Sequence, residues 1–134
     1  MNRVLSPGPR TGCVIVPGSK SRAHRLFLAA ALGRTPVQLT CRGLSDDLLA
    51  TLSCLEALGA QVESVKGDCF ILVPFSAPPA GEILLPCGES GTTLRFLLPL
   101  VGALGAEAVF QRRGRLPRRP LEPLLAELTR QGMT

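Results

Sequence analysis

The sequence has 134 residues, the length of one ordinary domain, and 46% of them are hydrophobic, so the chain can bury a core. Five Phe and neither Trp nor Tyr argue against a surface that stacks single-stranded nucleic acid. The net charge is +5 and no acidic residue precedes Asp46, which indicates an anionic partner: a nucleic acid, a membrane surface or a small phosphorylated substrate. A solvated basic surface is the plain alternative.

The first half of the chain predicts alternating strands and helices. Leucines recur at helical spacing after Asp46, and Gly33 and Gly59 are typical of helix ends. Ser45 is expected to cap the second helix, and Asp46 and Asp47 favour the positive end of its dipole. The expected elements are strand 11–16, helix 21–32, strand 37–41, helix 46–58 and the hairpin strands 61–65 and 69–73.

After a break at residues 78–81 the same order begins again. The expected elements are strand 82–85, helix 92–104, strand 107–111 and helix 121–131. Ser21 and Thr92 open equivalent helices, and Gly59 and Gly132 close equivalent helices after a similar interval. The pattern predicts an α/β fold of βαβαββ units, one complete (about 17–75) and one truncated (about 81–134). We therefore expect a fragment of a longer protein.

Two of the predicted helix starts carry residue types that hold anions. Residues 17–21 (P-G-S-K-S) precede Arg25 by about one turn, and residues 87–93 (C-G-E-S-G-T-T) precede Arg95. Unpaired N–H groups and the helix dipole favour an anion at such a start, and Lys20 adds a point charge. An ordinary capped helix with surface cations is the alternative for either one. Their repetition suggests two anionic groups, or one ligand held from two sides.

A third basic segment is the loop 112–120, R-R-G-R-L-P-R-R-P. Gly114 and the prolines prevent it from continuing as a strand or helix. Arginine forks suit phosphate and carboxylate, and ligands of α/β folds gather where strands lead into helices. A solvated loop or a nucleic-acid patch are the alternatives. His24, the single histidine, is expected to be structural or exposed.

The cysteines predict a reducing environment. Their number is odd, none have metal-ligand spacing, and each lies among apolar neighbours, so we expect reduced core thiols in a cytoplasmic protein. We also expect no signal peptide and no membrane span. The five are Cys13, Cys41, Cys54, Cys69 and Cys87.

Four motifs in order make the sequence resemble a known family. They are P-G-S-K-S-x-x-x-R, L-S-D-D-x-x-A-T ahead of L-G-A, G-x-S-G-T-T-x-R, and R-P before a helix, and they extend from Pro17 to about Gly132. In this order they resemble the EPSP synthases (3-phosphoshikimate 1-carboxyvinyltransferases). The resemblance implies the enolpyruvyl transferase fold, an inside-out α/β barrel with two domains of three βαβαββ units each. Residues 1–16 would then be the first strand of the second domain, which is absent from the sequence, and 17–134 part of the N-terminal domain.

The same resemblance implies roles for individual residues. Lys20 would be a catalytic residue that contacts both substrates, Ser21 and Arg25 would hold shikimate 3-phosphate, and a further group would hold phosphoenolpyruvate together with Lys20: Gly91, Thr92 and Arg119. Asp47 and Arg95 are expected to support the site. The chain departs from the family pattern at Glu89, where many members have Asn, at His24, where Asn is common, and at Arg22.

The implied reaction transfers the enolpyruvyl group of phosphoenolpyruvate to the 5-hydroxyl of shikimate 3-phosphate and releases phosphate. We expect no metal or organic cofactor, no nucleic-acid or membrane partner, and a monomer at full length. The fragment alone is expected to be inactive, because the family's acidic proton-transfer residues come from the second domain. A non-catalytic anion-binding fragment and a basic nucleic-acid-binding module stay open, and the latter would show a steep dependence on salt.

Overall fold

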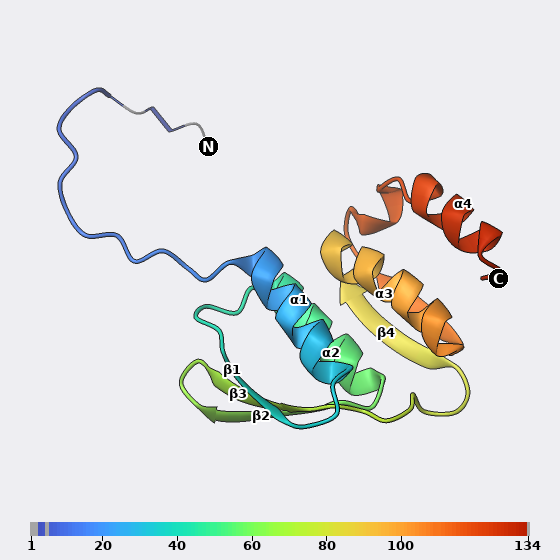
Figure 1. The fold of residues 1–134 in the computed structure, drawn as a ribbon. Coiled ribbons are helices and arrows are strands. Elements are labelled where there is room, and N and C mark those ends of the chain that lie inside the picture. Colours follow the sequence, from blue (N-terminus) through green and yellow to red (C-terminus); the bar gives the residue numbers. More distant parts are fainter. Residues whose placement is uncertain (1–2, 5, 134) are drawn as a thin grey trace.

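A computed structural model describes residues 3–4 and 6–133 and has a mixed α/β architecture (Figure 1). The first part is built of α1 (Lys20–Ala31), β1 (Val37–Thr40), α2 (Asp46–Ala57), β2 (Gln61–Lys66) and β3 (Cys69–Val73). The strands form an antiparallel sheet in the order β1-β3-β2. This arrangement confirms the helices, the later strands and the hairpin predicted for this part, with boundaries shifted by at most one residue.

The second part repeats the start of this order. It consists of β4 (Ile83–Gly88), α3 (Gly91–Leu104), β5 (Ala108–Arg112), a short 3-10 helix (Leu116–Arg118) and α4 (Glu122–Arg130). β4 and β5 pair in parallel, as strands joined by a crossover helix do. The basic loop 112–120 thus contains one turn of 3-10 helix, which the sequence did not predict.

Helix α2 joins the two parts because it packs on α1, on β4 and on α3. Figure 1 shows α1 and α2 over one face of the three-stranded sheet and α3 beside β4, with the three helix starts at the same end of the molecule. One shared apolar core follows. Its most deeply buried large side chains are Phe27, Leu55, Leu58, Leu72, Leu85, Leu94, Leu97 and Leu116.

Two expectations on helix α2 and the cysteines need adjustment. Ser45 does occupy the N-cap position of α2 with an extended backbone, but its side chain makes no capping hydrogen bond. Cys41, Cys54 and Cys87 are buried and free, as expected, whereas Cys69 is half-buried and Cys13 is exposed. Cys13 lies in a segment that packs against no core, so its apolar neighbours do not bury it.

The segment before α1 is not paired with any strand. The structure assigns no strand to residues 11–16, and Val14, Ile15 and Val16 are 83%, 84% and 74% exposed. The segment extends away from the helices and sheets (Figure 1). Its assignment to another domain stays a prediction. Separately, none of the helices in the described part of the chain has the length and apolar character of a membrane span.

Candidate functional site

Helices α1 and α3 begin in the same way. Ser19 precedes α1 and its side chain accepts a hydrogen bond from the Arg22 backbone N–H at 3.4 Å. Ser90 precedes α3 and accepts from the Thr93 N–H at 3.2 Å. Each cap satisfies one donor of the first turn and leaves other N–H groups of that turn available for an anion.

An arginine lies about one turn into each of these helices and folds back toward the start. The Arg25 guanidinium donates to the carbonyl of Ser21 at 3.3 Å, and that of Arg95 donates to the carbonyl of Gly91, also at 3.3 Å. Both cations are thereby held beside the first turn of their helix. Ser21 itself is exposed, and Thr92 is half-buried.

The two helix starts are neighbours in space. The Arg25 guanidinium lies 5.8 Å from the ring centroid of Phe96 on α3, within the range of a cation–π contact. His24 on α1 meets the same ring edge-on, with centroids 6.5 Å apart. The candidate residues of α1 and α3 therefore lie on one side of the molecule, as their equivalent places in the repeat predict.

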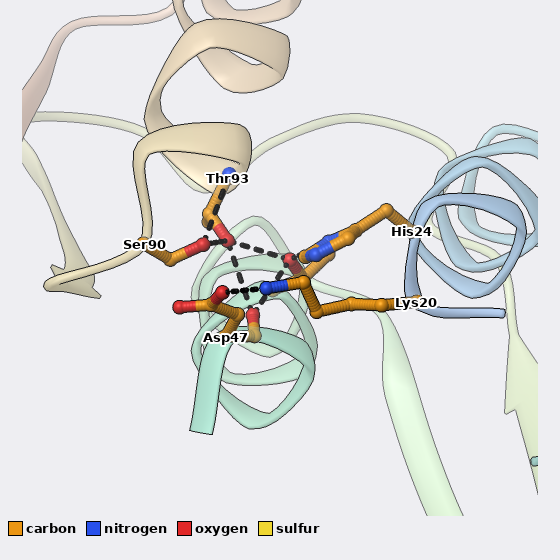
Figure 2. A network of polar contacts seen from close by, with 6 residues as sticks. Lys20, His24, Asp47, Ser90 and Thr93 are labelled. Carbon is orange, nitrogen blue, oxygen red and sulfur yellow. Dashed lines mark hydrogen bonds and ion pairs between the residues drawn. The ribbon is translucent and has the colours of Figure 1, made fainter. Parts of the chain in front are cut away.

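Lys20 pairs with Asp47, which comes from the first turn of α2. Their side chains are 50% and 31% exposed, so solvent screens much of the attraction between them. The contact brings the start of α2 beside the start of α1, and Figure 2 shows both residues close to Ser90 and Thr93. Asp47 is thus part of the candidate site, where the sequence motif gave it only a supporting role.

Arg95 and Arg119 converge on Gly91. A Cβ atom at residue 91 would lie 2.5 Å from Nη1 of Arg119 and 2.8 Å from Nη1 of Arg95, closer than real Cβ contacts allow. Arg95 also donates to the carbonyl of Pro120 at 3.1 Å and so ties the basic loop to α3. Within the described residues neither guanidinium pairs with a carboxylate. Gly91 therefore makes room for two cations at a helix start.

Glu89 and Arg22, two of the departures from the family pattern, do not enter this cation cluster directly. The Glu89 carboxylate lies against Gly114 of the basic loop, where the backbone has φ +55° and where a Cβ atom would collide with it. Arg22 lines a cavity of about 440 Å³ with Arg42 and Phe27. Lys20, Arg25 and Gly91 do not line that cavity.

A buried hydrogen-bond network underlies the site, and the sequence did not predict it. Nδ1 of His24 lies 2.7 Å from the hydroxyl of Thr51 on α2, which lies 2.7 Å from the hydroxyl of Thr93. The Thr93 hydroxyl donates to Ser90 at 2.7 Å, and both threonine hydroxyls lie 3.2 Å from the carbonyl of Asp47. Figure 2 shows this network between the starts of the three helices.

His24 is completely buried within this network. Burial lowers the pKa of its imidazole, the Asp47 carboxylate opposes this shift, and the Lys20 ammonium adds to it. A neutral ring is thus favoured. Of the two expectations for His24, structural or exposed, the exposed one is wrong because the side chain is completely buried.

Comparison with known proteins gives one consistent result. The family described as EPSP synthase (3-phosphoshikimate 1-carboxyvinyltransferase) matches residues 5–134. A curated 3-phosphoshikimate 1-carboxyvinyltransferase of Clostridium beijerinckii is 34% identical over 98% of this chain and 32% of the relative. One of Methanocorpusculum labreanum is 36% identical over the same shares. An EPSP synthase structure from Acinetobacter baumannii superposes with a TM-score of 0.72 at 28% identity, over 92% of this chain and 28% of that one.

The chain spans about a third of the length of the curated relatives it matches. Its α/β fold corresponds over nearly all of its length to one part of the EPSP synthase structure.

Proposed function

Because this chain belongs to the EPSP synthase family, we propose that it forms part of a 3-phosphoshikimate 1-carboxyvinyltransferase. The reaction transfers the enolpyruvyl group of phosphoenolpyruvate to the 5-hydroxyl of shikimate 3-phosphate and releases phosphate. One observation carries the proposal: two serine-capped helix starts converge and gather four cations, Lys20, Arg25, Arg95 and Arg119. Two multiply charged substrates that must react with each other need such an arrangement.

Shikimate 3-phosphate is assigned to the start of α1. The backbone N–H groups of the first turn and the Ser21 hydroxyl are suited to a phosphate oxygen. Arg25 lies one turn further on and is held back toward this turn, where it can add charge-assisted hydrogen bonds. Lys20 lies between the starts of α1 and α2, from which it can reach both substrates.

Phosphoenolpyruvate is assigned to the start of α3. Gly91 has no side chain to block the first turn, and Arg119 and Arg95 lie directly over it. The planar donors of an arginine match a carboxylate or a phosphate, and phosphoenolpyruvate carries both groups. Thr92 can add its hydroxyl to the same ligand.

This segment would contribute alignment and charge neutralisation to the reaction. In the addition step, the methylene carbon of phosphoenolpyruvate gains a proton while the 5-hydroxyl oxygen attacks the adjacent carbon and loses its own proton. In the elimination step, the tetrahedral intermediate loses phosphate and a proton from the new methyl group. Fixed cations hold two anions in reacting contact and stabilise the crowded negative charge. The acidic groups that move protons are assigned to the part of the family's length that this chain does not span.

The test is phosphate release from purified protein given both substrates. A full-length enzyme that contains this segment is expected to release phosphate only when both substrates are present, and its Lys20→Met variant is expected to lose most of that activity. The 134-residue chain alone is expected to release none above background. A full-length enzyme that ignores shikimate 3-phosphate would overturn the proposal.

A titration of the chain itself separates this proposal from nucleic-acid binding. We expect shikimate 3-phosphate to shift the amide NMR signals at the start of α1 most strongly, with shikimate as the control without a phosphate. Preferential binding of duplex DNA that declines steeply with added salt would favour the basic-module alternative instead.

A further inference from the structure

The buried network does more than the packing of the three helices requires. Among the described residues, the buried polar side chains are His24, Thr51, Ser90 and Thr93, and all four belong to this one network. Replacing a complete set of buried partners by apolar groups of similar shape is often neutral for stability. A buried network whose groups have defined partners instead favours a single geometry, and this network reaches the Lys20–Asp47 ion pair through the carbonyl of Asp47.

The attraction between Lys20 and Asp47 is too weak by itself to hold the two side chains in one place. Both side chains are partly exposed, at 50% and 31%, and exposed pairs gain little because solvent screens them and two side chains must be ordered. A lysine has a long, freely rotating stem and a compact charge. If Lys20 is to meet two substrates at a defined place, its partner Asp47 must be fixed by something else.

Asp47 connects the partly exposed ion pair with the buried network. Its carbonyl oxygen lies 3.2 Å from the hydroxyls of both Thr51 and Thr93, while its carboxylate accepts from Lys20. We propose that His24, Thr51 and Thr93 are positioning residues: their buried network fixes Asp47 against the start of α3, and through Asp47 it fixes the ammonium group of Lys20. The proposal rests on the proposed function in so far as Lys20 is a substrate ligand.

The network has a preferred direction. Nε2 of His24 is buried and has no hydrogen-bond partner among residues 3–4 and 6–133, and a buried N–H without a partner is rarer than a bare acceptor. The proton therefore lies on Nδ1 and is donated to the Thr51 hydroxyl, whose own proton passes to Thr93 or to the Asp47 carbonyl. With this assignment, the hydroxyl of Thr51 and the hydroxyl of Thr93 each donate one hydrogen bond.

The composition of the chain makes a spectroscopic test simple. Lys20 and Lys66 are the two lysines and His24 is the single histidine. Lysine labelled at its side chain gives two signals, with Lys66 on β2 as an internal reference, and ¹⁵N-histidine gives one ring. Thr93→Val is expected to move the Lys20 signal toward its position in Asp47→Asn and to leave Lys66 in place. A ring proton found on Nε2 would overturn the direction assigned to the network.

Two variants separate positioning from stability. Thr93→Ser keeps the hydroxyl and is expected to leave the Lys20 signal unchanged. Val101→Ala removes a buried side chain of α3 eight residues after Thr93, and should lower the melting temperature without moving the Lys20 signal. The proposal fails if Thr93→Val leaves the Lys20 signal in place, or if Val101→Ala moves it equally.

Ligand binding is the second readout. We expect Thr93→Val and Thr51→Val to weaken binding of shikimate 3-phosphate by about tenfold or more, since a misplaced ligand group is costly, and Thr93→Ser to retain wild-type affinity. The same change at an exposed site of α4, Thr129→Val, should have no effect. A wild-type chain that binds no shikimate 3-phosphate would count against the proposed function alone, because the Lys20 signal still decides the positioning.

Discussion

The starts of α1 and α3 share one local structure but differ in burial. Both have a serine cap and an arginine that returns to a carbonyl of the first turn. At α1 the cap is exposed and Lys20 follows it, half in solvent. At α3, Ser90 is 1% exposed and the buried Gly91 follows it beneath two guanidiniums. The first start presents a half-exposed charge paired with Asp47, and the second has two arginine side chains held over its first turn.

The largest effect is expected from a side chain placed at Gly91, beneath the two guanidiniums. Gly91→Ala places a methyl group where Nη1 of Arg119 and of Arg95 now lie. The long arginine side chains can move aside, so we expect stability to stay level or to rise slightly, because Ala favours a helix. The displaced donors should raise the KM for phosphoenolpyruvate in a full-length enzyme by about a hundredfold. An unchanged KM would show that the arginines are not held over Gly91.

A second change tests the fork of the arginine rather than its charge. Arg119→Lys in a full-length enzyme keeps the charge and loses the paired donors. A lost charged hydrogen bond costs about 1.5–3 kcal/mol, or roughly tenfold or more in rate or affinity. Steady-state kinetics should show weakened use of phosphoenolpyruvate and nearly intact binding of shikimate 3-phosphate.

The neighbouring arginine is the control for this prediction. Arg118 ends the 3-10 turn and is exposed, so Arg118→Lys is expected to be nearly silent. Equal effects at Arg118 and Arg119, or a loss confined to shikimate 3-phosphate, would contradict the assignment of Arg119 to phosphoenolpyruvate.

The two serine caps should differ in their contribution to stability. Ser90→Ala removes the acceptor for the Thr93 N–H and hydroxyl in a buried place, and is expected to lower the free energy of unfolding by about 1–2 kcal/mol. Ser19→Ala removes one long, exposed contact and should cost about 0.5 kcal/mol. Urea unfolding of both variants measures the difference, and equal losses would contradict the contrast in burial.

The smallest expected effect is a dependence of stability on pH. Because burial lowers the pKa of His24 from its ordinary 6.5, the unfolded chain binds a proton more readily than the folded one. The free energy of unfolding should therefore fall as the pH drops below about 6.5, by at most about 1.4 kcal/mol per pH unit. His24→Asn should flatten the curve between pH 6.5 and the folded pKa. A variant curve parallel to the wild-type curve would show that His24 does not titrate in this way.

Local signals in the sequence were sufficient for most of the fold. Leucine spacing and Gly33, Gly59 and Gly132 located the helices to within one residue, because these signals act inside one element. Residues 11–16 have the composition of a strand, but a strand exists only when a neighbour pairs with it, and the structure provides none.

The residues of the candidate site likewise include some that local sequence signals predicted and some that they did not. Lys20, Arg25 and Arg95 stand in motifs at helix starts and Arg119 stands in the basic loop before Pro120, so the sequence pointed to them. Thr51 is the last residue of the second motif and stands in the middle of α2, but its partners on α1 and α3 become apparent only when these helices pack against it. Ser45 shows the opposite case, since its cap position was clear from the sequence but its hydroxyl makes no capping bond. The contacts of Thr51 join helices that are distant in sequence, and no local signal reports them.

The contact between Thr51 and Thr93 also constrains how the family can vary. Each hydroxyl is buried against the other, one from each repeat of the fold. If only one of them became apolar, the other would keep a polar group with fewer partners, whereas an exchange of both would leave nothing unsatisfied. Across a large set of family sequences, positions 51 and 93 should therefore change together, and their covariation would record this contact in evolutionary history.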